Sequence, residues 1–296
     1  MRVKSIAAGI AVFLVIAFGT SSAYGIALYA SDLDGRLFRV NTDVFSVTSL
    51  GQLTYQSGSS TLNLNRVKGL DYDAQGVLHA LRTQQVTSTT GTGQLYTLNP
   101  SASAAGNAVF DGPPTIAGMA LFDGGLAFTD GDHFYASGFT NGRVVFGSIG
   151  LSTLTTYTRS DSFAFVGLEW YNDGTPDGRL LTLMQPNSGR LQLEEIIFGT
   201  TTLTHTPFAG APSLEQWTRG DLALMGDILY LALGRSTDSE LWAYDLTQGP
   251  SGQYTFIGDL PANISGLAAV PVPEPATVLL LGIGLAAMAA FRRSRR

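Results

Sequence analysis

Short apolar runs, separated by Gly, Asp, Asn and Ser, fill the chain between its two apolar ends. Examples are residues 28–30, 37–40, 77–81, 228–231 and 240–244. This spacing, together with Asp-Gly turns, is typical of β-hairpins. No long segment has the 3.6-residue periodicity of an amphipathic helix. The pattern predicts an all-β domain.

The apolar runs repeat in two registers. A glycine that opens an apolar strand recurs at intervals of 49, 49, 53 and 46 residues, at Gly69, Gly118, Gly167, Gly220 and Gly266. A second small residue that opens a strand recurs between these, at Gly35, Gly93, Gly142, Gly189 and Ser239. A period near 49 with about four strands per unit is what a β-propeller blade needs.

The repeat predicts a five-bladed β-propeller over residues 26–270. A six- or seven-bladed propeller and a β-sandwich are the alternatives. The last opening strand, residues 264–270, has no hairpin after it, and the first unit begins without an opening strand. We therefore expect the two ends to join in one blade, which closes the ring and leaves no open array of edges.

Acidic residues near the opening glycines suggest a candidate catalytic site. If the opening strands line a central channel, the position two after each glycine carries Asp71, Ala120, Glu169, Leu222 and Ala268. A shift of one residue in the fourth unit replaces Leu222 with Asp221. Three carboxylates around one axis resemble the arrangement in five-bladed glycosidases. This resemblance implies that, among Asp71, Glu169 and Asp221, one acid protonates the leaving oxygen, a second acts as nucleophile or activates water, and a third tunes the pair. Because no sequence motif supports it, catalysis is the alternative interpretation.

Aromatic residues suggest a binding site instead. Trp170, beside Glu169, and Tyr72, beside Asp71, could present flat faces to a sugar ring, although aromatic residues also fill the space between blades. The three histidines lie in separate units and are expected to be packed or surface residues. No cofactor is predicted; Ca²⁺ is considered because paired acids occur at residues 32–34, 71–73 and 130–132, but no complete calcium-binding loop follows them.

The two ends of the chain carry targeting signals. Arg2 and Lys4 precede an apolar stretch and an Ala23-Tyr24-Gly25 cleavage site, which predicts a signal peptide, a short apolar helix, over residues 1–25. At the other end, residues 276–291 form an apolar run of roughly 24 Å as a helix, enough for a short transmembrane helix. The flanking residues are Pro273, Glu274 and Pro275 before it and Arg292, Arg293, Arg295 and Arg296 in the basic end after it.

Residues 271–296 resemble a PEP-CTERM sorting signal. The resemblance implies an exosortase substrate of a Gram-negative bacterium, exported by the Sec machinery, held transiently in the inner membrane, and then released to the cell surface or the exopolysaccharide (biofilm) matrix. Between residues 26 and 275 the chain carries 11 basic and 23 acidic residues, a net charge near −12, so nucleic acid is not an expected partner. The predicted function is a non-catalytic polysaccharide-binding, protein-binding or structural propeller; the alternative is a secreted glycoside hydrolase-like enzyme.

Overall fold

The computed structural model describes residues 27–271, except 88–89, 102–106, 121–123, 130, 139–141, 160–164, 176–177, 185–190, 209–218 and 235–236. Ala27–Val270 forms a compact unit of its own. The predicted signal helix, the predicted transmembrane helix and the sorting residues from Pro273 to Arg296 lie outside the described residues. Within the described residues, no helix is long and apolar enough to cross a membrane.

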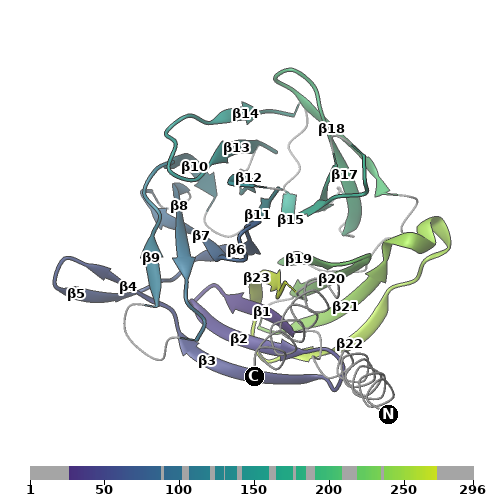
Figure 1. The fold of residues 1–296 in the computed structure, drawn as a ribbon, viewed down its shortest axis with the longest axis horizontal. Helices are drawn as coiled ribbons and strands as arrows, with labels where there is room; N and C mark the ends of the chain where they lie inside the picture. The colour runs from purple at the N-terminus through teal and green to yellow at the C-terminus, as the bar shows by residue number, and fades with distance from the viewer. Residues whose placement is uncertain are drawn as a thin grey trace, which may run out of the picture. The chain divides into compact units, whose positions relative to one another are not determined.

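The described chain is all-β and propeller-like. Four of its sheets have four antiparallel strands each (Figure 1). Their strands, in sheet order, are β23 (Ile264–Ala269), β1 (Ala27–Asp32), β2 (Arg36–Asn41) and β3 (Ser46–Gln52); β11 (Gly125–Phe128), β12 (His133–Ser137), β13 (Val144–Ser148) and β14 (Thr155–Tyr157); β15 (Phe165–Tyr171), β16 (Arg179–Met184), β17 (Gln192–Phe198) and β18 (Leu203–Pro207); and β19 (Arg219–Met225), β20 (Ile228–Gly234), β21 (Ser239–Asp245) and β22 (Thr255–Leu260). A 3-10 helix, η2 (Leu246–Ser251), joins β21 to β22.

The remaining sheet has seven strands. They are β5 (Ser60–Asn63), β4 (Thr54–Ser57), β9 (Ala108–Phe110), β8 (Thr90–Leu98), β7 (Leu78–Gln85), β6 (Val67–Tyr72) and β10 (Ile116–Ala120), which pairs with β8. The prediction of five like blades is therefore wrong in number, because four sheets are regular blades and this one is enlarged. Its additions are the β4–β5 hairpin, which projects from the rim of the ring in Figure 1, and β10.

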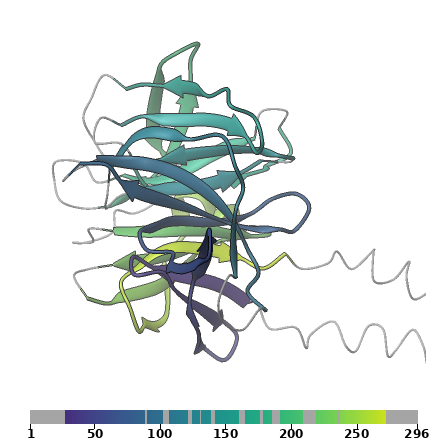
Figure 2. The same ribbon diagram turned by 90° about the vertical axis from the view of Figure 1, so that its left-hand side faces the viewer.

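The innermost strands form a closed ring. In order around it, the neighbouring pairs are β6 with β11, β11 with β15, β15 with β19, β19 with β23, and β23 with β6. In the perpendicular view most strands run from one face of the ring towards the other, and the sheets are twisted (Figure 2). The second inner strand is β11, not the apolar run predicted to open at Gly118; Gly118 lies inside β10, which extends the sheet of β8 instead.

The two ends of the described chain pair with each other, as the repeat predicts. Strand β1 runs antiparallel to β23, with Leu28 opposite Ala269. The N–H of Val270 also donates to the carbonyl oxygen of Ala27, at 3.0 Å. The first sheet is thus completed by the last strand, which closes the ring and removes two open edges.

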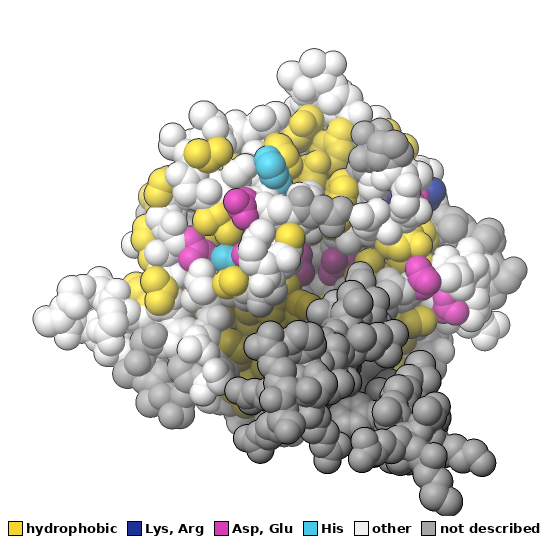
Figure 3. Space-filling model, in the orientation of Figure 1, with side chains coloured by type: hydrophobic (Ala, Val, Ile, Leu, Met, Phe, Trp, Pro, Cys, Tyr) yellow, Lys and Arg dark blue, Asp and Glu magenta, His cyan; other side chains and the backbone are white. Residues whose placement is uncertain are grey.

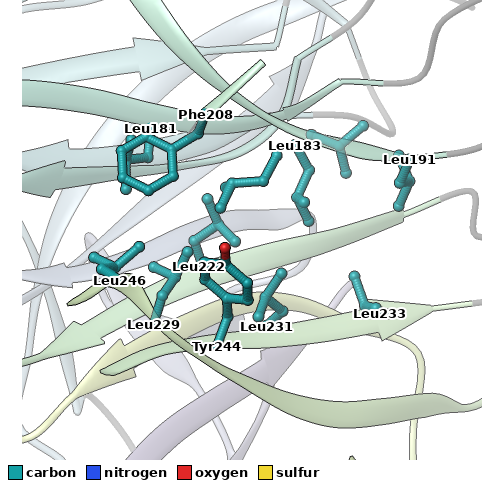
Figure 4. Close-up of a cluster of buried hydrophobic side chains, with 12 residues drawn as sticks. Leu181, Leu183, Leu191, Phe208, Leu222, Leu229, Leu231, Leu233, Tyr244 and Leu246 are labelled. Carbon is teal, nitrogen blue, oxygen red and sulfur yellow. The ribbon is translucent and has the colours of Figure 1, made fainter. Parts of the chain in front are cut away.

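Apolar side chains between neighbouring sheets form the core. Between the β15–β18 sheet and the β19–β22 sheet, Leu181 and Leu183 meet Leu222 and Leu231 (Figure 4). Tyr244 is fully buried there, and its hydroxyl donates to the carbonyl oxygen of Gly249 at 2.6 Å. With no cysteine in the chain, this packing and the strand pairing hold the ring together.

Candidate functional site

Glycines stand where the inner strands approach each other most closely. A Cβ atom on Gly69 would lie 2.5 Å from the nitrogen of Leu126, so the neighbouring backbone excludes a side chain. On the next inner strand, each of these glycines faces the residue that directly follows the equivalent position. The pairs are Gly69–Leu126, Gly125–Leu168, Gly167–Leu222 and Gly266–Leu70. We call this layer of the ring the glycine level.

Asp71 joins two inner strands. Its Oδ1 accepts a hydrogen bond from its own neighbour, the N–H of Tyr72, at 2.7 Å, and its Oδ2 accepts one from the N–H of Phe128 on β11, at 2.5 Å. Gly69 faces Leu126 and Asp71 faces Phe128, two places further on in both strands, so β6 and β11 run parallel.

Glu169 repeats this arrangement two sheets away. Its Oε1 accepts from the N–H of Trp170 and its Oε2 from the N–H of Leu224 on β19, both at 3.1 Å. Asp71 and Glu169 therefore occupy the same layer, two residues beyond the glycine level. The other inner strands place Ala127, Ala223 and Ala268 there.

Asp221 lies in a different layer from the other two acids. It stands at the glycine level, where four of the inner strands carry glycine, and its Oδ2 accepts from the N–H of Leu267 on β23 at 2.8 Å. The expectation that Asp221 takes the place two after the opening glycine is therefore wrong; Ala223 holds that place. Asp221 is completely buried, and it occupies space that the missing side chain of Gly167 leaves open.

The three carboxyl groups nevertheless act on one another. Burial raises the pKa of Asp71 to about 7, against the opposing effect of the N–H groups of Phe128 and Tyr72. Burial, followed by the charges of Asp71 and Asp221, raises the pKa of Glu169 well above its usual range. Burial raises the pKa of Asp221 in the same way, while N–H groups, that of Leu267 first, oppose the rise. The structure thus brings the three predicted acids together, in a mutually repelling group. Figure 3 shows acidic side chains around the middle of one face of the ring.

A buried Asp-His-Asp group lies beside Asp71. His79 is directly opposite Asp71 in the β6–β7 pair. Its Nε2 lies 2.9 Å from Asp73 Oδ2 and its Nδ1 lies 3.1 Å from Asp111 Oδ2. Burial acts to lower the pKa of His79, but hydrogen bonds and charges from Asp111 and Asp73 together raise it above 6.5.

Sequence reasoning missed this group because it considered His79 alone. Asp111 follows β9, 32 residues further along the chain. It is held by two further hydrogen bonds, from the N–H of Thr97 at 2.9 Å and from the Thr97 hydroxyl at 2.6 Å. One local feature of the sequence could have indicated the His79–Asp73 contact: the two residues lie on either side of the turn closed by Gly76.

The two aromatic candidates pack between sheets. The ring of Trp170 stacks on Tyr135 with centroids 5.7 Å apart, and it is half-buried in the core of the neighbouring sheets. Tyr72 is half-buried beside Tyr29, and burial raises the pKa of its hydroxyl. Both residues contact the apolar cores that separate the sheets.

Three of the acids considered for Ca²⁺, Asp32, Asp71 and Asp73, accept hydrogen bonds from the protein itself. Asp32 accepts from the backbone N–H of Arg36 at 2.8 Å and from its Nε at 2.6 Å. Asp73 Oδ1 accepts from the N–H groups of Gln75 and Val77, at 3.0 and 2.8 Å. Asp130 lies outside the described residues. Among those that are described, no group of three His, Asp or Glu side chains has the arrangement of a metal site.

Comparison with known families identifies the carboxyl-terminal tail. Residues 271–296 match the PEP-CTERM protein-sorting motif. The PEP-CTERM motif implies recognition by an exosortase, and with it export and transient membrane anchoring through the tail. No curated protein sequence matches the chain.

Solved structures with some similarity to this chain include two from bacteria. A periplasmic gluconolactonase of Pseudomonas aeruginosa is 12% identical, with a TM-score of 0.42, over 84% of this chain and 99% of that one. A protein of unknown function from Bacteroides caccae is 8% identical, with a TM-score of 0.43, over 84% of this chain and all of that one. At these scores the likeness carries no argument about fold or activity.

Proposed function

We propose that this chain is an exported, exosortase-processed protein whose ring domain is a non-catalytic binding or structural module. It acts at the cell surface or in the extracellular matrix of a Gram-negative bacterium, on polysaccharide or on another surface protein. The observation that carries the non-catalytic part is the use of the acid oxygens. In Asp71 and Glu169, each carboxylate oxygen accepts a backbone N–H, one of them from the adjacent inner strand.

A carboxylate that catalyses glycoside hydrolysis has to reach the glycosidic oxygen, the anomeric carbon or a water molecule. Here the oxygens of Asp71 and Glu169 bridge neighbouring sheets, and Asp221 is completely buried. Removing these bridges to free the acids would leave buried N–H groups unpaired, at about 1–3 kcal/mol each. The acids therefore serve best as links between inner strands.

The test of this role is a glycan panel applied to residues 26–270, a stretch that contains the whole closed ring. The binding interpretation predicts retention on one or more glycans without release of reducing ends. It also predicts that Glu169→Gln lowers the free energy of unfolding but has a smaller effect on how much of the folded protein is retained on the glycan. Reducing ends released by the wild type and lost in Glu169→Gln would overturn it.

A secreted glycoside hydrolase-like enzyme is the second candidate. Asp71 favours it, because this acid is only half-buried and has a pKa of about 7, in the range of a general acid or base at neutral pH. In this case Asp71→Asn and Glu169→Gln would each abolish product release while the folded fraction remained. Product release that survives both substitutions would rule out these carboxylates.

The sorting tail has its own test. Deleting residues 276–296 should prevent membrane retention and exosortase processing, so that the protein changes both its cell fraction and its mature mass. Unchanged fractionation and unchanged mass would overturn the assignment. The closing strand β23 ends at Ala269, so this deletion leaves every described strand in place.

A further inference from the structure

The outer part of the β19–β22 sheet carries four side chains on one open face. In the β21–β22 pair, Trp242 lies directly opposite Phe256. Glu240 lies directly opposite Asp259 in the same pair. Residues two apart on β21 point to the same side, so the four side chains share one face. Strand β22 is the outermost strand of its sheet (Figure 1). Phe256 is 48% exposed and Asp259 is exposed, so the face is open at this edge.

Neighbouring side chains close the region around this face. Leu231, which lies opposite Trp242 on β20, is fully buried in the core that this sheet shares with the β15–β18 sheet. The reverse face of β22 is also covered, because Phe45 lies against Gly258. The open face is therefore confined to the two outer strands, where Trp242 is half-buried.

Trp242 and Phe256 form a fixed aromatic pair. Their rings meet edge-on, with centroids 5.3 Å apart and an angle of 66° between the planes. The indole N–H of Trp242 donates to Oε2 of Glu240 at 3.0 Å. Because Trp242 also packs against the core, the pair loses little freedom when a ligand binds.

The two carboxylates beside this pair repel each other. Like charges that lie directly opposite on neighbouring strands destabilise a sheet. Within the described part of the chain, neither Glu240 nor Asp259 forms an ion pair with a basic side chain. Asp238, two residues before Glu240, is exposed as well. A cation between these carboxylates would remove the repulsion, and the excess of acids over bases in the chain attracts cations to the protein.

An organic cation suits this face better than a metal ion. Ca²⁺ takes about six to eight oxygen ligands, which is more than two carboxylates offer. Aromatic faces, by contrast, attract ammonium groups and the apolar faces of sugar rings. The aromatic pair lies two residues, about 7 Å, further along β21 than the carboxylate pair. A matching ligand therefore presents a ring face and a positive charge side by side.

We propose that Trp242, Phe256, Glu240 and Asp259 bind a polysaccharide of amino sugars whose amines are free and protonated. In such a chain each pyranose ring carries its own ammonium group. A ring over the aromatic pair then brings the ammonium group of the same sugar or of the next one to the carboxylates. Hydrogen bonds from an ammonium group to a carboxylate are charge-assisted. A sugar ring also loses less conformational freedom than a lysine side chain of a basic protein. This inference rests on the binding role proposed above and names the ligand class.

The test compares three soluble ligands on the mature protein by titration calorimetry: chitosan oligomers, chitin oligomers of the same length, and lysine oligomers with the same number of charges. Chitosan is a chain of glucosamine, and chitin is the same chain with its amines acetylated and uncharged. At slightly acidic pH we expect chitosan to bind, with an affinity that falls as NaCl rises, and the other two to bind at least about tenfold more weakly. Equal affinity for chitin would overturn the role of charge. Equal or tighter binding of the lysine oligomers would overturn the polysaccharide assignment in favour of a basic protein.

Substitutions locate the site. Glu240→Gln, Asp259→Asn and Phe256→Ser should each lower chitosan affinity about tenfold. The amide oxygen of the new glutamine still accepts the indole N–H, so Glu240→Gln removes the charge and keeps the contact. Asp132→Asn removes an exposed carboxylate from the β11–β12 turn, and Phe110→Ser removes a ring of similar exposure. Each of these two controls should change the affinity less than about twofold.

The outcomes separate the site from the binding function. Asp259→Asn relieves the repulsion with Glu240, so this variant should stay folded and remains informative if Phe256→Ser does not fold. Chitosan affinity that withstands both Asp259→Asn and Glu240→Gln would overturn this site. Binding to another glycan but to no chitosan oligomer would overturn the ligand class and leave the binding function intact. Absence of binding to every glycan and protein tested would overturn both.

Discussion

Asp221 stands against Gly167 at the centre of the ring. A Cβ atom on Gly167 would lie 2.9 Å from the Cα of Asp221 and 2.9 Å from its Oδ1. Four inner strands carry glycine at this level, and the fifth carries an acid. The single carboxyl group fills the space that the glycines leave, and it links β19 to β23 through the N–H of Leu267.

The contact between Gly167 and Asp221 predicts a large cost for Gly167→Ala. The substitution combines a positive φ of +75° with a collision against backbone, and we expect it to lower the free energy of unfolding by about 2–5 kcal/mol. Gly76→Ala is a matched control, because Gly76 has the same φ of +75° and no atom within 4 Å of the added Cβ. It should cost about 1–2 kcal/mol. Equal losses for the two variants, measured by urea denaturation, would refute the contact.

Asp71 should make the protein less stable as pH rises. The pKa of Asp71 is 3.8 in the unfolded chain and about 7 in the folded protein. Between these two pH values the folded state therefore holds a proton that the unfolded state has released. The contribution of Asp71 to the free energy of unfolding is therefore complete below pH 3.8 and is lost as the pH rises towards 7. Asp71→Asn should therefore flatten the curve of unfolding free energy against pH.

In the interval from about pH 4 to 5.5 His79 is protonated in both states, and Asp71→Asn removes only the part of the slope that Asp71 adds to those of Glu169 and Asp221. Asp34→Asn, which removes a carboxylate whose side chain is 82% exposed, is the control. A slope that Asp71→Asn leaves unchanged would contradict the raised pKa of Asp71.

His79 should stay protonated to a higher pH than an ordinary histidine, because its pKa is raised above 6.5. Its pKa is raised by Asp111 and Asp73, so its contribution is complete below about pH 6.5 and falls as pH rises through the folded-state pKa. His79→Gln leaves two buried carboxylates without their cation, and we expect a loss of about 3–5 kcal/mol at pH 6 that shrinks at higher pH. His133→Gln, at an exposed histidine, is the control. An NMR titration that places the pKa of His79 at or below 6.5 would be incompatible with this pairing.

Trp170 should matter for stability rather than for glycan binding. Its ring stacks on Tyr135 and packs against Gly178, where a Cβ atom would collide with it. Trp170→Ala should lower the free energy of unfolding by about 3 kcal/mol, at the low end for such a deletion because the ring is half-buried. Affinity for any glycan should change less than twofold among folded molecules. A loss of affinity without a loss of stability would restore Trp170 as a binding residue.

Local chemistry made much of the fold predictable. Apolar runs between Asp-Gly turns identify strands, because glycine allows the positive φ of a tight turn, as at Gly76. The unpaired strands at the two ends predict the β1–β23 closure, since an open ring would leave exposed edges. These inferences depend on neighbours in sequence or on the length of the repeat.

What failed depends on contacts between distant residues. Gly118 and Gly125 each precede a short apolar run in the sequence, and only tertiary packing makes the strand that begins at Gly125 the inner one, while Gly118 lies inside β10, which pairs with β8. Asp221 replaces a glycine rather than shifting by one place, which no local pattern reveals. The bonds of Asp71 to Phe128, and of His79 to Asp111, likewise join residues from different strands or sheets.

The pairing of Ala27 with Val270 determines how the domain would respond to force. Strand β1 begins where β23 ends, so a pull applied between these two residues opens the ladder one bond after another. The pair of Leu28 and Ala269 would part first, and the pair of Asp32 and Ile264 last. Such unzipping loads a single hydrogen bond at a time, whereas shearing would load the whole ladder together. A domain tethered at both ends would therefore be mechanically weakest at its own closing seam.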